Sequence, residues 1–398
     1  MLRFVFACVC WLVASGAAAS VPPPVNPLTN AAPAIQAAID ACPDGCVVQL
    51  EPGTYRLAST VNVPSNIVLV GAGPMTRVQV EGNRYGFLIA GSHVWIGGFT
   101  LSAVTTQTSG GGISFASAGF NVAVANLVFE HGLYIGVDVA PTVANRGIYT
   151  LRSLRWNGVA SSNTAVKIGN GTHHLSDVSV TDLSGTAATP ADMAVWVDVL
   201  PQTDTIDLGR LTLIKGGAGV RVGVGAVTPS AVTGFTLHDS PAIESMTAYG
   251  VLIQSANNVR IENISAAQNQ GGVGIGAGVR GLLLTGSVLH YNKGDGVTMW
   301  AGASGATISN NLIADNNTLG SYWGFGVSIG SGVSDFTVSG NRIGNALLWG
   351  GGFQRYCVFL ASGASNRYSI TGNACVGHTY GDIVDGGTGT KKVVSGNY

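Results

Sequence analysis

The segment GVSIGSGVSDFTVSGNRIG, residues 326–344, holds two short runs of alternating apolar and polar residues, separated by a glycine-rich turn. A period of two is typical of β-strands with one buried face. The first run, GVSI, recurs in variant form at spacings of 22 to 31 residues. The copies are GISF (112–115), GVDV (136–139), AVKI (165–168), AVWV (194–197), GVRV (219–222), GVLI (250–253), GVGI (272–275), GVTM (296–299), GVSI (326–329) and CVFL (357–360).

Such units must stack, because two or three short strands cannot bury an apolar face alone. A leucine-rich repeat needs a Leu-x-x-Leu-x-Leu pattern that is absent here, and a propeller blade needs about 40 residues or more. The period therefore favours a parallel β-helix with loops of variable length. Asn311, Asn341 and Asn373 recur at one place in the last units, and stacked amides there would bond successive turns. We predict a structural role for them.

The composition excludes several classes of protein. Of 398 residues, 58 are glycine, 46% are hydrophobic and 10% are charged, with a net charge of −1. The high apolar content excludes disorder. No run of Lys and Arg is longer than two residues, so we predict no nucleic-acid partner.

The N-terminus has the features of a cleaved targeting segment. Residues 1–19 combine a positive Arg3, an apolar run at Phe4–Val13 and small residues at Ala17–Ala19, where cleavage is expected. The apolar run is too short to cross a bilayer, so we predict no membrane span. We expect removal of residues 1–19 and a secreted or periplasmic protein.

The remainder is predicted to form one domain. Residues 20–30 are proline-rich and form an extended lead-in, and residues 31–398 form the β-helix domain. Ala31–Ala41 is rich in alanine and places Ile35 and Ile39 at helical spacing, which predicts a short capping helix.

Four cysteines remain in the predicted mature chain. An even number in an exported protein favours disulfide bonds over free thiols. Proximity in the repeat predicts the pairs Cys42–Cys46 and Cys357–Cys375.

The segments AIQAAIDACPDGCVVQLEPGTY (34–55) and NVPSNIVLVGAG (62–73) resemble the N-terminal cap and first coil of the pectate-lyase-like superfamily. The later repeats are similar to its generic coil, so the resemblance covers about residues 31–398. It implies an all-β fold, a single-stranded right-handed parallel β-helix. The superfamily includes polysaccharide lyases, glycoside hydrolases, uronate epimerases and viral tailspikes. The paired Asp, Gly-His-Gly and Arg-x-Lys of polygalacturonases and the Asp-Pro-His of alginate epimerases are absent, so no catalytic residue is transferred by motif.

Stacking in register would align equal positions of the repeat at steps of ~4.8 Å. The second and fourth residues of each first strand are apolar and point inward, so the third points outward. The outward positions hold four ionisable side chains, all in four consecutive units, with tryptophan and glutamine beside them. This predicted groove comprises Asp138, Lys167, Trp196, Asp198, Arg221, Gln254 and Trp300.

Two interpretations of the groove are open. Opposite charges on adjacent strands stabilise any sheet by about 0.2–1 kcal/mol, so the charges could be ordinary surface pairs. The small residues around them and two tryptophans, which we expect to be exposed, instead favour a carbohydrate groove. The turn HYNKGDG (290–296), with Tyr291, Lys293 and Asp295, is typical of a solvated loop.

The favoured function is an exported lyase that cleaves a uronate-containing polysaccharide by β-elimination. The reaction needs a base at C5 and a cation on the carboxylate; Lys167 or Arg221 would be the base and the other cation would bind the carboxylate. Trp196, Gln254 and Trp300 would bind the sugar. Asp138 and Asp198 could help to hold Ca²⁺, although two strand steps, ~9.6 Å, separate them.

Two alternatives remain. An inverting glycoside hydrolase needs carboxyl groups about 6.5–9.5 Å apart, near the predicted separation of Asp138 and Asp198. Lys167 between them would keep both ionised, which disfavours a general acid. The C-terminal repeats also resemble phage-tailspike coils, which is consistent with a non-catalytic, adhesin-like carbohydrate-binding β-helix.

Overall fold

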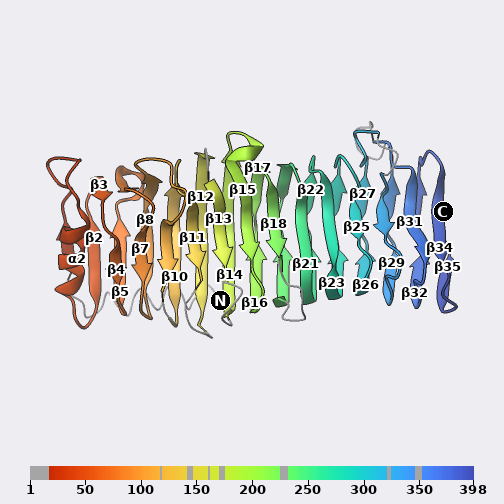
Figure 1. Ribbon diagram of the computed structural model, residues 1–398, viewed down its shortest axis with the longest axis horizontal. Helices are drawn as coiled ribbons and strands as arrows, with labels where there is room; N and C mark the ends of the chain where they lie inside the picture. Colours follow the sequence, from red (N-terminus) through yellow and green to blue (C-terminus); the bar gives the residue numbers. More distant parts are fainter. Residues whose placement is uncertain are drawn as a thin grey trace. The chain divides into compact units, whose positions relative to one another are not determined.

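The computed structural model describes residues 18–116, 119–140, 147–159, 162–169, 175–224, 232–320, 324–345 and 352–398. Contacts divide the chain into two compact units, Met1–Ala188 (unit 1) and Thr189–Tyr398 (unit 2). Each unit is a parallel β-solenoid, and together they hold about 13 turns. Within each unit, strands from successive turns lie side by side (Figure 1). This confirms the predicted all-β solenoid.

In unit 1, each turn contributes one strand to a sheet that we call face A, and the chain then bends through two further faces. Face A consists of β4 (Val61–Val63), β7 (Tyr85–Ile89), β9 (Gly111–Phe115), β11 (Ile135–Val139) and β13 (Ser162–Ile168). The other faces consist of β1 (Ala18–Val21), β2 (Cys46–Leu50), β3 (Gly53–Leu57), β5 (Ile67–Gly71), β6 (Thr76–Val80), β8 (Trp95–Ala103), β10 (Val122–Phe129), β12 (Tyr149–Val159) and β14 (Leu175–Ala187), with the 3-10 turn η1 (Gly73–Met75).

Unit 2 repeats this plan. Its face A consists of β15 (Met193–Val199), β18 (Ala218–Val222), β21 (Tyr249–Glu262), β23 (Gly271–Thr285), β25 (Val297–Met299), β28 (Val327–Ile329), β31 (Tyr356–Gly363) and β34 (Gly381–Gly387). Face B adds β16 (Thr203–Gly209), β19 (Val232–His238), β26 (Ser304–Ser309), β29 (Phe336–Ser339), β32 (Tyr368–Thr371) and β35 (Lys392–Ser395) to the second halves of β21 and β23. Face C consists of β17 (Thr212–Gly216), β20 (Ala242–Met246), β22 (Ser265–Ala267), β24 (Val288–His290), β27 (Leu312–Ala314), β30 (Arg342–Gly344) and β33 (Ala374–Val376); the 3-10 turn η2 (Pro190–Asp192) precedes β15.

The core is made of ladders of identical or similar apolar residues. On face A of unit 2, the second residue of each repeat pairs with its equivalent on the next strand, and all these side chains are fully buried: Val220, Val251, Val273, Val297, Val327 and Val358. The residue that follows each of them points outward, as predicted. Stacking of equal side chains therefore fixes the register of each strand, because a slip by one residue would place every valine in water.

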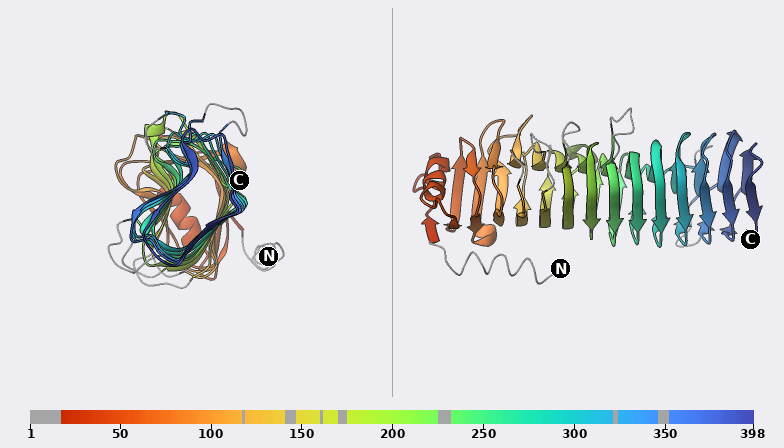
Figure 2. Two further views of the ribbon diagram at one scale, coloured as in Figure 1. Left: turned by 90° about the vertical axis from the view of Figure 1, so that its right-hand side faces the viewer. Right: turned by 90° about the horizontal axis from the view of Figure 1, so that it is seen from below.

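The predicted capping helix is confirmed as α2 (Ala32–Asp40), the single α-helix of the described residues. Ile35 and Ile39, one turn apart, are buried, and the helix contacts β1, β2, β3 and β4 at the N-terminal end of unit 1 (Figure 2). It thereby covers apolar side chains of the first turn that no preceding turn covers.

The predicted targeting segment lies mostly outside the described residues, which begin at Ala18. Ala18 and Ala19 belong to β1 and pair with Val47 and Val48 of β2. The predicted cleavage after Ala19 and a single domain over 31–398 remain predictions. Among the described residues, the structure holds no helix that is both long enough and apolar enough to span a membrane.

Both predicted disulfide bonds are present. Cys42–Cys46, with Cα atoms 5.7 Å apart, links the end of α2 to β2. Cys357–Cys375, with Cα atoms 5.6 Å apart, joins β31 on face A to β33 on face C. Cys357 is fully buried and Cys375 is nearly so, so this bond crosses the interior of one turn.

The recurring asparagines form a hydrogen-bonded ladder, which confirms their predicted structural role. The Nδ2 atoms of Asn311, Asn341 and Asn373 each donate to the Oδ1 atom of the next asparagine, at 2.9 Å, and Asn397 ends the row. A second ladder, absent from the sequence prediction, runs through Asn269, Asn292 and Asn316. The ladders satisfy backbone groups at the turns, where no strand partner is available.

We expect Asn341→Ala to destabilise the protein more than Asn397→Ala. Asn341 is 1% exposed and its side chain bonds to both neighbouring asparagines and to the Ile308 carbonyl. Each buried group left without a partner costs about 1–3 kcal/mol. Asn397 is the matched control, because it ends the same ladder and is half-exposed. Urea unfolding of both variants measures the difference; equal losses would contradict the ladder's dependence on burial.

Candidate functional site

The predicted groove takes residues from both units, and each half is described by itself. In unit 1, Asp138 and Lys167 are adjacent outward residues of β11 and β13, as predicted. The Lys167 Nζ atom lies 3.5 Å from the Asp138 Oδ1 atom. The sequence prediction missed the third member of this cluster, Tyr85, whose hydroxyl donates to the Asp138 Oδ2 atom at 2.5 Å. We call these three residues the Tyr85–Asp138–Lys167 cluster.

Tyr85 reaches Asp138 across an intervening strand because that strand carries glycine. Gly111 of β9 pairs with Tyr85 on one side and with Ile135 of β11 on the other. A Cβ atom at Gly111 would lie 3.0 Å from the Tyr85 Cε1 atom. Any larger residue would therefore displace the ring, and the hydroxyl would lose the carboxylate.

The cluster couples a buried proton acceptor to a phenol and a cation. Burial raises the pKa of Asp138, and the Lys167 charge and the hydrogen bond from Tyr85 only partly oppose this. Burial and the nearby carboxylate also raise the pKa of Tyr85, so the phenol stays protonated. Asp138 is 5% exposed, while 27% of the Lys167 side chain is accessible. Lys167 is therefore the more accessible of the two charged groups.

The unit 2 half of the predicted groove has a different character. Asp198 pairs with Arg221, whose Nε and terminal nitrogen donate to its two carboxylate oxygens at 2.9 and 2.7 Å. This bidentate hydrogen bonding raises the pKa of Arg221, although burial opposes it. The guanidinium therefore stays protonated, and two of its donors are held by Asp198, which removes Arg221 as a candidate base.

The expectation that Trp196 is an exposed stacking platform is wrong, because its side chain is 0% exposed. The strand pairs Val197 with Val220 and Asp198 with Arg221, so WVDV, and not AVWV, is the segment equivalent to GVRV. Trp196 occupies the place of a glycine in the repeat. Its Nε1 atom donates to the Lys215 carbonyl at 2.9 Å.

Gln254 and Trp300 are exposed, as predicted. Trp300 is 37% exposed and follows β25. Its ring lies over Gly274 of β23, where a Cβ atom would come within 2.8 Å of the ring. It also packs edge to face against Tyr249, with the ring centroids 5.4 Å apart.

Asp295 lies in the predicted turn and is partly exposed, but its carboxylate is hydrogen-bonded within the protein, which the expectation of a solvated loop did not include. Its Oδ1 atom accepts from the Phe325 amide at 2.8 Å, and its Oδ2 atom accepts from Thr298 Oγ1 at 3.0 Å. Tyr249 in turn donates to Thr298 at 3.3 Å, and Ser328 lowers the pKa of the same carboxyl group. Burial raises the pKa of Asp295 from 3.8 to about 6. No positive group offsets this burial.

The sequence holds a weak signal for the Tyr85–Asp138–Lys167 cluster and for the hydrogen-bonded group of Tyr249, Thr298 and Asp295. A tyrosine at the start of a face A strand is followed, one repeat later, by a glycine at the paired position, and its hydroxyl reaches a polar residue one strand further. The two instances are Tyr85, Gly111 and Asp138 in unit 1, and Tyr249, Gly271 and Thr298 in unit 2.

The structure gives no support to a calcium site in the groove. Asp138 already faces Lys167, and Asp198 is neutralised by Arg221. In the described part of the chain, the cluster of metal-ligating types is Cys357, Cys375 and His378, in which both sulfur atoms belong to a disulfide.

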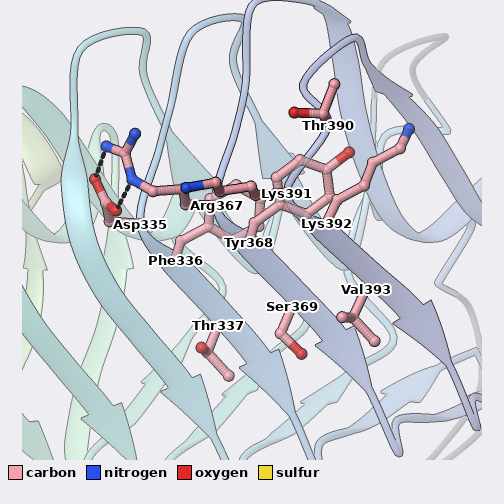
Figure 3. A pocket seen from close by; sticks show the side chains of 10 residues that line it. All are labelled: Asp335, Phe336, Thr337, Arg367, Tyr368, Ser369, Thr390, Lys391, Lys392 and Val393. Atoms are coloured by element: carbon pink, nitrogen blue, oxygen red, sulfur yellow. Dashed lines mark hydrogen bonds and ion pairs between the residues drawn. The ribbon is translucent and has the colours of Figure 1, made fainter.

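A hollow of about 500 Å³ lies on face B of unit 2, between β29, β32 and β35. Figure 3 shows Arg367 turned toward Asp335, with which it forms a two-point ion pair at 2.5 and 2.7 Å. The hollow is open and its only carboxylate is occupied by this arginine. The titratable clusters lie on face A, so we place the candidate sites there.

Comparison with known proteins agrees with the fold. A family model described as a right-handed β-helix region matches residues 227–397. Among solved structures, the A-module of the mannuronan C-5 epimerase AlgE6 from Azotobacter vinelandii is 18% identical; the alignment covers 94% of this chain and 96% of the module, with a TM-score of 0.63. The tailspike of E. coli bacteriophage HK620, in complex with a hexasaccharide, is 14% identical; the alignment covers 94% of this chain and 77% of the tailspike chain, with a TM-score of 0.64.

The catalytic unit of a GH87 α-1,3-glucanase from Streptomyces thermodiastaticus is 15% identical; the alignment covers 95% of this chain and 68% of the glucanase chain, with a TM-score of 0.54. No curated protein sequence matches the chain. These findings and the parallel strands define a right-handed parallel β-helix. At these identities the likeness establishes the fold alone.

We expect the stability of the protein to fall as the pH rises through about 6, owing to Asp295. Its folded pKa lies above its ordinary value of 3.8, so the folded state binds more protons than the unfolded state between these values. Its contribution to the free energy of unfolding is therefore fully present below pH 3.8 and is lost as the pH rises to about 6. The neighbouring Tyr249 stays protonated throughout, since burial raises its pKa.

Urea unfolding of wild type and Asp295→Asn between about pH 4 and pH 7 tests this, because the variant should show the flatter profile. Asp335→Asn is the control. Arg367 lowers the pKa of the exposed Asp335, so the pH dependence of its contribution to stability has the opposite sign: this contribution is lost as the pH falls. Parallel profiles for wild type and Asp295→Asn would contradict the prediction.

Proposed function

We propose that this protein acts on a uronate-containing polysaccharide, and that the Tyr85–Asp138–Lys167 cluster removes the C5 proton in a β-elimination. The observation that carries the proposal is the 2.5 Å hydrogen bond from Tyr85 to a buried carboxylate, with an accessible lysine 3.5 Å from that carboxylate. A phenol, a buried acceptor and a cation on one outward face are the groups that this chemistry needs.

The lysine supplies the electrostatic part of the reaction. A uronate carboxylate placed against Lys167 is neutralised, and this makes the adjacent C5 proton more acidic. Asp138 lies 3.5 Å from the Lys167 Nζ atom and holds the ammonium in position. The sequence prediction gave Lys167 the choice of base or carboxylate binder, and the ion pair favours the second role.

The proton moves through Tyr85. The phenol oxygen accepts the C5 proton while its own proton passes to the Asp138 Oδ2 atom, whose raised pKa favours proton uptake. The electron pair of the C5–H bond forms the C4=C5 double bond, and the C4–O4 bond breaks. The leaving oxygen takes a proton from Tyr85 as Asp138 returns its own, so the enzyme ends in its starting state.

The hydrolase alternative has less support. A glycosidase of the usual kind needs two carboxyl groups around one bond. Among the described residues of the cluster, Asp138 is the only carboxylate, and Asp198 in unit 2 is bound on both oxygens by Arg221. The similar structures include a mannuronan C-5 epimerase, and inversion at C5 would share the first step proposed here.

Lys167→Met and Tyr85→Phe should each lower kcat by about 10²–10⁴-fold, the usual contribution of a proton-transfer group, while the protein stays folded. Arg221→Met is the matched control, since it removes a cation of face A that has no role in the proposed step, and it should keep activity. The assay measures unsaturated uronate absorbance on alginate and polygalacturonate, beside a reducing-end assay and NMR of hydrogen exchange at C5.

Each result of this assay is decisive. Absorbance that depends on Lys167 and Tyr85 supports the lyase. C5 exchange without absorbance supports the cluster but replaces elimination by epimerisation. Reducing ends without either signal, or activity that survives both substitutions, would overturn the proposal. Export through the predicted cleavage after Ala19 is a separate proposal, and N-terminal sequencing of the mature protein tests it.

A further inference from the structure

We propose that face A of unit 2 contains a separate binding site for neutral sugar units, with Trp300 as its stacking platform and the hydroxyls of Thr298 and Ser328 as its polar floor. The site lies wholly within unit 2 and uses none of the residues of the Tyr85–Asp138–Lys167 cluster. It is a binding site, and no chemistry is assigned to it.

The platform is built by two glycines. Gly274 leaves room for the Trp300 ring, and Gly271 leaves room for the Tyr249 ring, since a Cβ atom at Gly271 would lie 2.3 Å from that ring. Tyr249 supports the edge of Trp300 at 5.4 Å. The indole is thus held over the sheet with 37% of its surface exposed. An aromatic ring held in this way offers the apolar surface on which the C–H face of a pyranose stacks.

The floor follows directly from the strand register. Gly274, Thr298, Ser328 and Phe359 pair in sequence across β23, β25, β28 and β31. Each step is ~4.8 Å. Successive strands of the unit therefore present the Trp300 ring, which lies over Gly274, then the hydroxyls of Thr298 and Ser328, and then the Phe359 ring. Phe359 itself stacks on Phe325 at 4.6 Å, which fixes the second ring.

The Thr298 hydroxyl of the floor is already oriented. Thr298 donates to Asp295 and accepts from Tyr249. Its side chain cannot rotate freely, so little entropy is lost when a sugar hydroxyl approaches.

The charge on this face selects the class of ligand. From Leu252 to Phe359, the outward positions are uncharged, and the Asp295 carboxyl accepts a hydrogen bond from Thr298 in this row. A uronate laid over Asp295 would bring two carboxylates together without a cation between them. Neutral pyranoses avoid this cost, which contrasts with unit 1, where Lys167 suits an acidic sugar.

Saturation-transfer NMR tests the site, with a mixture of soluble neutral hexasaccharides of glucose, mannose, galactose and xylose as the probe. We expect transfer from the wild-type protein to at least one of them. Trp300→Ala should weaken the binding by at least about tenfold, and Trp300→Phe, which keeps a ring, should restore part of it. Tyr398→Ala is the control, because Tyr398 is 78% exposed at the C-terminus, outside this face, and should bind normally.

Gly274→Ala tests the geometry without removing any group that touches the sugar. Its Cβ atom would displace the Trp300 ring, so affinity should fall while the free energy of unfolding changes little. No transfer to any neutral hexasaccharide, or unchanged transfer to Trp300→Ala, would overturn the proposal. Stronger binding of oligogalacturonate than of every neutral probe would overturn the assignment to neutral sugars.

The experiment separates this site from the proposed function. Lys167→Met and Tyr85→Phe should leave neutral-sugar binding unchanged. Loss of neutral-sugar binding in either variant would show that the two sites do not have separate roles.

Discussion

The in-register stacking of parallel strands is the constraint on which every site in this protein depends. Equal side chains lie at steps of ~4.8 Å, so the identity of an outward residue and of its neighbours one and two turns away determines what it can touch. Buried valine ladders such as Val220 to Val358 hold this register, because a slip of one residue would exchange the core for the surface. The outward residues can therefore vary without loss of the fold, and chemistry can be placed on a surface whose spacing is already set.

Three carboxylates in or beside the strands of face A show how such neighbours decide function. Asp198 meets a guanidinium in bidentate geometry and becomes a stable ion pair. Asp138 accepts a hydrogen bond from a phenol and faces an ammonium at 3.5 Å, and burial still dominates, so its pKa rises. Asp295 meets only neutral donors, and its pKa rises to about 6. The residue type is the same in each case, and the partner supplied by the adjacent turns distinguishes a structural pair from a group able to exchange protons.

The periodicity of the sequence was sufficient for the fold, the capping helix, the disulfides and the asparagine ladder, because each depends on spacing within one turn or between equal positions. The site was predictable only where the register was unambiguous: Asp138 beside Lys167 follows from GVDV and AVKI. Trp196 was misplaced because MAVWVDV contains two overlapping matches to the repeat, and only packing selects the second. Tyr85 was missed because it acts across an intervening strand, a distance that the pattern of one repeat does not encode.

Glycine in the intervening strand allows a tyrosine side chain to contact a residue two strands away. Glycine in a strand costs backbone entropy and contributes no packing, so its presence opposite a tyrosine is unfavourable for the sheet alone. Gly111 and Gly271 occupy the position over which a tyrosine ring lies, and in each unit the hydroxyl then meets a polar group one strand further on. The same recess allows Trp300 to lie over Gly274. A sheet of larger residues would hold these rings upright and separate them from their partners. The stability given up at these glycines is thus what allows a regular stack of strands to form polar clusters that span several turns.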